Sequence, residues 1–209
     1  TEGMTHSGLH MIDTLRDYLS NFCHAPDGEE RDSLEEEIWK QFGAERTVLV
    51  LDMAGFSLLT RRYGVVHYLS MVRRMQDTVR PIIHEHSGSL VKFEADNAFA
   101  TFPGLESAVD AAIAMNRAVE IENRKYAPDF ALRLSYGLDH GRILLLEGKD
   151  FFGDAVNTAS KLGEDLARPG EILVARSGIE EMAPALLERG KPVRFSISGI
   201  ELDALSISY

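Results

Sequence analysis

The 209-residue sequence contains one cysteine, Cys23, and therefore cannot form an internal disulfide. Without disulfides the fold has to rely on a packed core, as is usual in the cytoplasm. No apolar run approaches the roughly 18 residues that span a membrane, and the first residues lack the basic start and apolar stretch of a signal peptide. We therefore expect a cytoplasmic protein with no membrane partner.

Basic residues are also scarce, because 22 Lys and Arg face 33 Asp and Glu, for a formal net charge of −11 at pH 7. Proteins that bind nucleic acid through its phosphates need the opposite balance, so we expect no nucleic-acid partner. An acidic chain can still bind a nucleotide, since metal ions bridge carboxylates to phosphates. What is present, 44% hydrophobic and 26% charged residues, is typical of a globular protein with a sizeable core.

Residues 1–45 have the pattern of two helices rather than of a catalytic unit. Apolar residues recur at helical spacing in His10–Phe22 and in Ser33–Phe42, on either side of a polar loop. Ser33 and the glutamate three positions later resemble a capping box, so we expect the second helix to begin there. The sequence thus predicts an N-terminal helical arm followed by a larger domain over 46–209.

From Thr47 onward the pattern alternates between strands and helices. Thr47–Met53 is typical of a buried strand, and a long helical stretch, Tyr63 to His86, follows. The order of elements matches a ferredoxin-like βαββαβ core with an extension, an α+β fold. After this helix we expect a strand hairpin, Ser89–Phe93 with Ala98–Phe102, and then a helix, Leu105–Asn123. A second strand pair follows, Ala131–Asp139 with Arg142–Glu147, and then a helix, Ala155–Leu166, and a strand, Glu171–Ala175. A short helix and two strands end the chain.

Two aspartates, Asp52 and Asp96, are candidate metal ligands. Asp52 is near the end of the buried strand, where an unpaired charge is costly. Asp96 is at the tip of the predicted hairpin, which neighbours the first strand in a ferredoxin-like sheet. Taken singly, each has a plainer interpretation: Asp52 could cap a helix, and Asp96 could be a turn residue. Together, with phosphate oxygens, they form the hard oxygen set that magnesium prefers.

Four blocks of the sequence resemble the class III adenylate and guanylate cyclases. They are VLVLDMAGFSLLT, LVKFEADNAFATF, YGLDHGRILLLEG and DFFGDAVNTASKL. They occur in the family's order, on the predicted elements, and the resemblance covers about Arg46 to Tyr209. It implies a ferredoxin-like βαββαβ core extended as in class III nucleotide cyclases, and active sites that form only in a homodimer.

The resemblance also implies roles for individual residues. Asp52 and Asp96, with the Met53 carbonyl, would bind two metal ions, Mg²⁺ or Mn²⁺. Lys92 and Asp150 would read adenine, because a lysine donor suits N1 and a carboxylate acceptor suits the 6-amino group. In this family the metal aspartates come from one subunit and the base-reading pair from its partner, so two sites span a symmetric homodimer. The plainer alternative makes Lys92 a solvated strand charge and Asp150 a turn residue.

The remaining roles include two departures from the family pattern. Asn157 would orient the ribose, although it could also be an ordinary exposed helical residue. Lys161 stands where the family has an arginine that contacts the α-phosphate, and lysine lacks the planar fork of arginine. Ser198 stands where a lysine grips the β- and γ-phosphates. Arg142 matches a family position that can approach the phosphates and could compensate.

The sequence therefore predicts an adenylate cyclase that converts ATP to cyclic AMP and pyrophosphate by attack of the 3′-hydroxyl on the α-phosphate. The alternative is a homodimer of the same fold that binds ATP and metal with little or no turnover, because the phosphate-binding cations are depleted. A pyrimidine nucleotide as substrate is disfavoured by Lys92 with Asp150. A ferredoxin-like RNA binder is disfavoured by the negative charge and by the missing aromatic RNA-binding strand.

Overall fold

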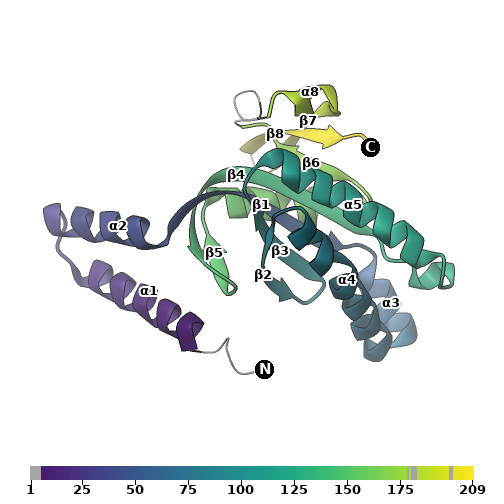
Figure 1. The fold of residues 1–209 in the computed structure, drawn as a ribbon, viewed down its shortest axis with the longest axis horizontal. Coiled ribbons are helices and arrows are strands. Elements are labelled where there is room, and N and C mark those ends of the chain that lie inside the picture. The colour runs from purple at the N-terminus through teal and green to yellow at the C-terminus, as the bar shows by residue number, and fades with distance from the viewer. Residues whose placement is uncertain (1–5, 178, 180–182, 198–199) are drawn as a thin grey trace.

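The computed structural model describes residues 6–177, 179, 183–197 and 200–209 (Figure 1). Its strands are β1 (Gly43–Met53), β2 (Ser89–Glu94), β3 (Asn97–Phe102), β4 (Leu134–Leu146), β5 (Asp150–Phe152), β6 (Ile172–Ala175), β7 (Gly190–Ile197) and β8 (Ile200–Ile207). Its α-helices are α1 (His6–His24), α2 (Glu29–Phe42), α3 (Phe56–Tyr63), α4 (Val65–Glu85), α5 (Leu105–Asn123), α6 (Asp154–Ser160) and α8 (Ala185–Glu188). A 3₁₀-helix, η1 (Pro128–Phe130), and a π-helix, η2 (Lys161–Leu166), complete the described elements.

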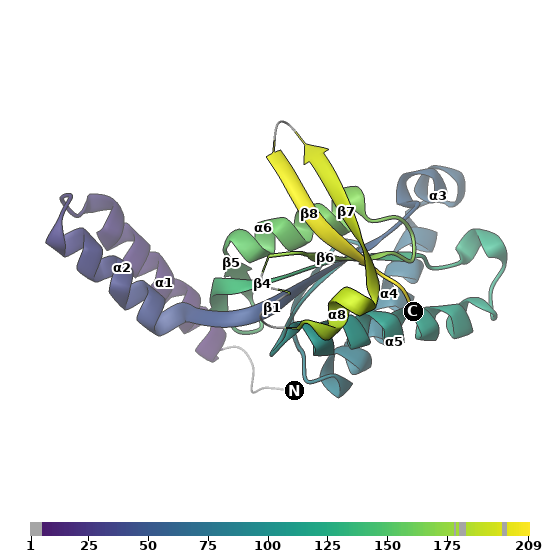
Figure 2. The ribbon, with the colours of Figure 1, turned by 90° about the horizontal axis from the view of Figure 1, so that it is seen from above.

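The strands form one eight-stranded sheet in the order β2-β3-β1-β4-β6-β8-β7, with β5 paired to β4. β1 is central because both of its faces are apolar, and residues 48–51 are fully buried. Leu49 and Leu51 pack in the main core with α4 and α5, whereas Val48 and Val50 pack in a second core with β5 and α6. Figure 2 shows α4 and α5 on one side of the sheet and α6 on the other. This layered arrangement confirms the predicted α+β fold class.

The second strand pair differs from its prediction. Instead of turning at His140-Gly141, β4 runs without interruption from Leu134 to Leu146. The reason is that β1 begins at Gly43, four positions before the predicted start, so that Arg46 pairs with Gly141 and Thr47 with His140. A ladder partner for both residues removes the need for a turn. The hairpin partner of β4 is the short β5.

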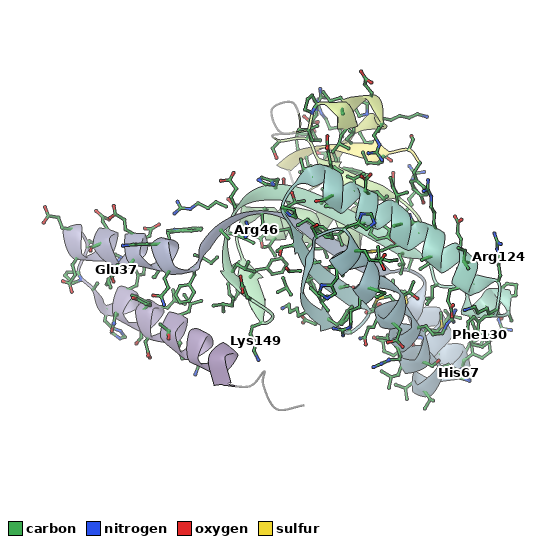
Figure 3. All side chains as sticks on the ribbon, in the orientation of Figure 1. Glu37, Arg46, His67, Arg124, Phe130 and Lys149 are labelled. Carbon is green, nitrogen blue, oxygen red and sulfur yellow. The ribbon has the colours of Figure 1, made fainter. Side chains whose placement is uncertain are left out.

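The helices differ from the prediction at two places. The expected helix from Tyr63 to His86 is α4, and the helix α3 before it was not predicted. Gly64, at φ +86°, separates the two, in a conformation that glycine adopts without steric cost. α2 begins at Glu29, so Ser33 is internal and forms no capping box. Acidic residues of the first turn complement the helix dipole at that end instead. His67 of α4 and Phe130 of η1 stack 5.3 Å apart near the α3–α4 junction and are labelled in Figure 3.

No described helix is long and apolar enough to cross a membrane. The apolar faces of α4 and α5 are used in the core instead. α1 and α2 form a helical hairpin that projects from the sheet (Figure 1) and buries Leu15, Ile38 and Phe42.

α6 and η2 lie directly on the backbone of β4. A Cβ atom on Gly137 would lie 2.0 Å from the Ala159 carbonyl oxygen and 2.3 Å from the Gly163 nitrogen. No side chain fits between elements this close, so the sheet and the π-helix meet through two glycines. This contact fixes the segment 154–166 on the sheet face that carries Asp52.

Replacing Gly137 by alanine should destabilise the fold, because either β4 or η2 must move to admit the methyl group. We expect Gly137→Ala to lower the free energy of unfolding by about 3 kcal/mol, the upper range for overpacking. Gly141→Ala is the matched control on the same strand, since its Cβ would lie 3.4 Å from the Ala155 Cβ. Urea denaturation of both variants checks this; equal stabilities would contradict the close approach.

Candidate active site

The structure brings Asp52 and Asp96 together at one end of the sheet. β3 pairs antiparallel with β1, with Leu51 opposite Ala98, so the turn that precedes β3 lies beside the end of β1. Ala95 in that turn has φ +51°, a left-handed conformation that is uncommon for alanine. Asp96 follows it directly, within electrostatic reach of Asp52.

The carboxylates at this end of the sheet outnumber the cations. Burial, followed by the charges of Asp96 and Glu164, raises the pKa of Asp52 to about 6. The pKa of Glu164 is also raised, first by burial and then by Asp165 and other carboxylates. No cation of the described residues is among the causes of either shift. Sequence reasoning missed Glu164 and Asp165, because the π-helical turn of η2 decides which way they point.

These donors fit a divalent cation. Within the described ranges, no three His, Cys, Asp or Glu side chains form a metal-binding group by themselves. A metal would therefore be shared by Asp52, Asp96, the Met53 carbonyl and oxygens of a ligand, a set of hard donors suited to Mg²⁺ or Mn²⁺. Burial and then the neighbouring carboxylates raise the pKa of Asp52, and a bound cation would favour its ionised form.

Lys92 and Asp150 meet although 57 residues of chain separate them. The Lys92 Nζ lies 3.1 Å from the Asp150 Oδ1 and 3.1 Å from the Glu94 Oε2. Burial lowers the pKa of Lys92, but hydrogen bonds to Glu94 and Asp150 outweigh it and the net shift is upward. The Phe151 N–H donates to Asp150 at 2.9 Å and orients the carboxylate. Glu94 was not identified from the sequence.

The segment α6–η2 carries the two predicted catalytic residues. Asn157 is exposed on α6. Lys161 begins η2, and its Nζ lies 2.5 Å from the Asp165 Oδ2, so its charge is engaged by a carboxylate one turn further on. Their roles toward a nucleotide stay predictions. Ser198 lies outside the described residues.

The structure does not bring Arg142 to the aspartate pair. In the register of β1 with β4, Asp52 lies opposite Ser135 but Arg142 lies opposite Glu45, at the far end of both strands. The Arg142 guanidinium lies 4.1 Å from the centre of the Trp39 ring, a cation–π contact with the arm. Within one protomer, Arg142 is therefore not available to compensate for a missing phosphate ligand.

Arg133 is an exposed cation opposite Ala54, just beyond the end of β1, that sequence reasoning missed. The Ala54 N–H donates to the Arg133 carbonyl at 2.8 Å, which extends the ladder past Met53. Strand alternation then makes Arg133 a diagonal neighbour of Asp52, at roughly 7–8 Å between Cα atoms. Its exposed side chain lines a hollow with Ala54 and Gly55, and it has no ion pair within the part of the chain that the structure describes.

Comparisons with known proteins show which sequences and structures this chain is similar to. No family model matches the sequence. A Rhizobium meliloti protein named "Putative adenylate cyclase 3" is 31% identical over 134 residues, 64% of this chain and 22% of that protein. "Adenylate cyclase 2" of the same organism is 25% identical over 162 residues, 70% of this chain and 44% of that protein. A solved structure, an adenylate/guanylate cyclase/hydrolase from Silicibacter pomeroyi, matches with a TM-score of 0.67 and 24% identity, over 79% of this chain and 96% of that chain.

The chain has the fold of class III adenylate/guanylate cyclase domains and is similar in sequence to proteins named adenylate cyclase. The chain matches less than half of the length of either curated relative. The fold and the relatives together support a nucleotide cyclase domain.

Ionisation of Asp52 should make the metal-free cyclase domain less stable as pH rises. Its pKa is raised in the folded chain from 3.8 to about 6, so the folded state holds the proton more tightly. The free energy of unfolding should therefore fall between about pH 4 and about pH 6 and level off above. Asp139, with a pKa also raised to about 6 by burial, contributes in the same direction.

Asp52→Asn removes one of these two contributions and tests the assignment. At pH 8 without divalent metal, the variant should exceed the wild type by about 1 kcal/mol, a value reduced for solvent screening. At pH 4 the two proteins should converge. Urea denaturation at both pH values checks this, and a difference independent of pH would contradict it.

Proposed function

We propose that the chain is an adenylate cyclase domain that converts ATP to cyclic AMP and pyrophosphate, with two Mg²⁺ or Mn²⁺ ions per site, in active sites shared by a homodimer. The observation that carries the proposal is the Lys92–Asp150 pair at 3.1 Å. It sets a donor beside an acceptor, which matches N1 and the 6-amino group of adenine. Guanine presents the reverse edge and would leave both groups unpaired, a mismatch that is strongly penalised.

Each predicted site residue then has a role in the reaction. Asp52, Asp96 and the Met53 carbonyl would hold the metals, which when bound stabilise the attacking and leaving oxygens of an in-line displacement. Asn157 orients the ribose so that the 3′-oxygen faces the α-phosphorus. The bond from this oxygen to the α-phosphorus forms, the bond to the bridging oxygen of pyrophosphate breaks, and the hydroxyl proton is released. Lys161 would leave Asp165 to meet the α-phosphate.

The triphosphate needs further positive charge, because Ser198 is neutral and Arg142 contacts Trp39. Arg133 is positioned to supply it, since it neighbours the strand end that carries Asp52 and Met53. An arginine can bind phosphate oxygens through two parallel N–H groups.

The dimer is proposed from the resemblance to class III cyclases, in which one subunit supplies the metal aspartates and its partner the base-reading pair. In this chain Asp52 and Asp96 would form the first group, and Lys92 with Asp150, 3.1 Å apart, the second. A twofold axis would join each group to its counterpart in a second copy.

A second candidate function is a regulatory module that binds ATP with little or no turnover. It is favoured by the Lys161–Asp165 contact at 2.5 Å, which engages the cation expected at the transition state. Ground-state binding would persist, because the base-reading pair and the aspartates do not depend on Lys161.

Incubation of the purified chain with Mn²⁺ and each of the four ribonucleoside triphosphates tests the proposal. We expect cyclic AMP from ATP, at least about tenfold faster than any other cyclic product, since the polar pair rejects other bases. Asp52→Asn and Asp96→Asn should each abolish turnover while the circular dichroism spectrum is unchanged. ATP binding without product in the wild type would favour the regulatory module, and a different cyclic nucleotide would overturn the base assignment.

Mixing two inactive variants tests the shared sites. Asp96→Asn disables the metal half-site and Asn157→Ala the ribose half-site, so a heterodimer combines both lesions in one site and leaves the other intact. We expect about a quarter of wild-type activity in an equimolar mixture, because half of the dimers are mixed and each has one working site. Native mass spectrometry verifies subunit exchange, and exchange without recovered activity would exclude sites built from two subunits.

A further inference from the structure

The N-terminal arm holds the hairpin that carries Asp150. Figures 1 and 2 show α1 and α2 beside β4 and β5, at the end of the sheet where β1 begins. We use the name arm–hairpin cluster for the apolar residues that meet there. Its buried members are Leu15, Ile38, Phe42 and Leu146, and the partly buried Tyr18, Phe22 and Leu144 pack against them.

One face of the last part of β4 packs against the arm. Residues two apart point to the same side of a strand, and Arg142, Leu144 and Leu146 form such a series. Arg142 stacks on Trp39 at 4.1 Å, and both leucines pack in the arm–hairpin cluster. The intervening Ile143 and Leu145 pack on the opposite side, with Phe151 and α6. The strand is thus held between the arm and the domain.

Asp150 lies directly across the hairpin from the clamped residue. Leu146 pairs with Asp150 in the antiparallel ladder, and β5 has only three residues. The turn between them passes through Gly148 at φ +66° and Lys149, which Figure 3 marks. A strand this short has little stability of its own, so the position of Asp150 depends on what holds Leu146.

We propose that Leu146 is a positioning residue for the base-reading pair, and that the arm, through Leu146 and Arg142, sets the affinity and base selectivity of the nucleotide site. The physical link is the sequence of contacts from Ile38 to Leu146, from Leu146 to Asp150, and from Asp150 to Lys92. The Lys92 Nζ lies 3.1 Å from the Asp150 Oδ1, which is near the upper limit of a hydrogen bond. A shift of about 1 Å in the hairpin would therefore break this contact. The proposal rests on the proposed function only for the identity of the base.

The effect should be on nucleotide recognition rather than on chemistry. Ile38 is 5% exposed and Leu146 3% exposed, so shortening Ile38 opens a cavity against the hairpin. The aspartates lie at the other end of β1 and keep their surroundings. In Ile38→Ala we therefore expect KM for ATP to rise about tenfold, the preference for ATP over GTP to fall by a similar factor, and kcat to stay within about twofold.

The decisive comparison is between Ile38→Ala and Leu34→Ala in the full chain. Leu34 lies one turn earlier on α2 and lines a hollow between α1 and α2 with Ser20 and His24, away from β4. It loses the same number of atoms without touching Leu146. Ile38→Val, which keeps most of the contact, should recover wild-type behaviour. If Ile38→Ala fails to fold, Trp39→Leu replaces it, because it removes the Arg142 contact and keeps an apolar side chain.

Amide hydrogen exchange of the segment 144–152 is the readout that does not require turnover. Ile38→Ala should speed exchange at Phe151 and its neighbours at least about fivefold, whereas Leu34→Ala should leave it unchanged. Equal exchange in the hairpin of both variants would overturn the inference, even in a fully active enzyme. Faster hairpin exchange with unaltered ATP and GTP discrimination would overturn the link to Asp150. If the wild type makes no cyclic AMP, the exchange comparison still decides whether the arm holds the hairpin.

Discussion

The contact between the backbones of β4 and η2 is the constraint on which the candidate site depends. Gly137 and Gly163 let a helical segment lie on the sheet without intervening side chains. The segment that carries Asn157 and Lys161 is therefore held by main-chain geometry rather than by packed side chains. The same contact places Glu164 close enough to Asp52 to raise the pKa of Asp52. Glu164 thereby adds to the negative charge at that end of the sheet.

Charge accounts for much of the remaining arrangement. Asp52, Asp96, Glu164 and Asp165 gather where one buried strand ends, and Lys161 is already paired with one of them. Such a cluster costs folding free energy unless a cation joins it. The proposed reaction would bring metal ions to this end of the sheet, and the ions would relieve the repulsion only when they are bound.

The arm and the hairpin show how a segment without a chemical role can take part in recognition. β4 is one continuous strand, so its first residues lie beside the end of β1 that carries Asp52, and its last residues pair with β5, which carries Asp150. A displacement at the arm would act on the second region and not on the first. The proposed base reading and the proposed chemistry would then be separable along one strand.

The sequence by itself determined the fold class and the order of most elements. Periodicity located β1, α5 and the β2–β3 hairpin, because these signals depend on neighbouring positions. The resemblance of short motifs predicted Asp52, Asp96, Lys92 and Asp150 as site residues. Tertiary structure alone decided that β4 runs through His140 and Gly141, since the extra residues of β1 supply its partners. It also decided that Arg142 stacks on Trp39, that Glu94 pairs with Lys92, and that Glu164 lies near Asp52. Arg133 is opposite Ala54 for the same reason. These contacts join residues far apart in the chain, and no local pattern encodes which of many surface charges a folded sheet will bring together.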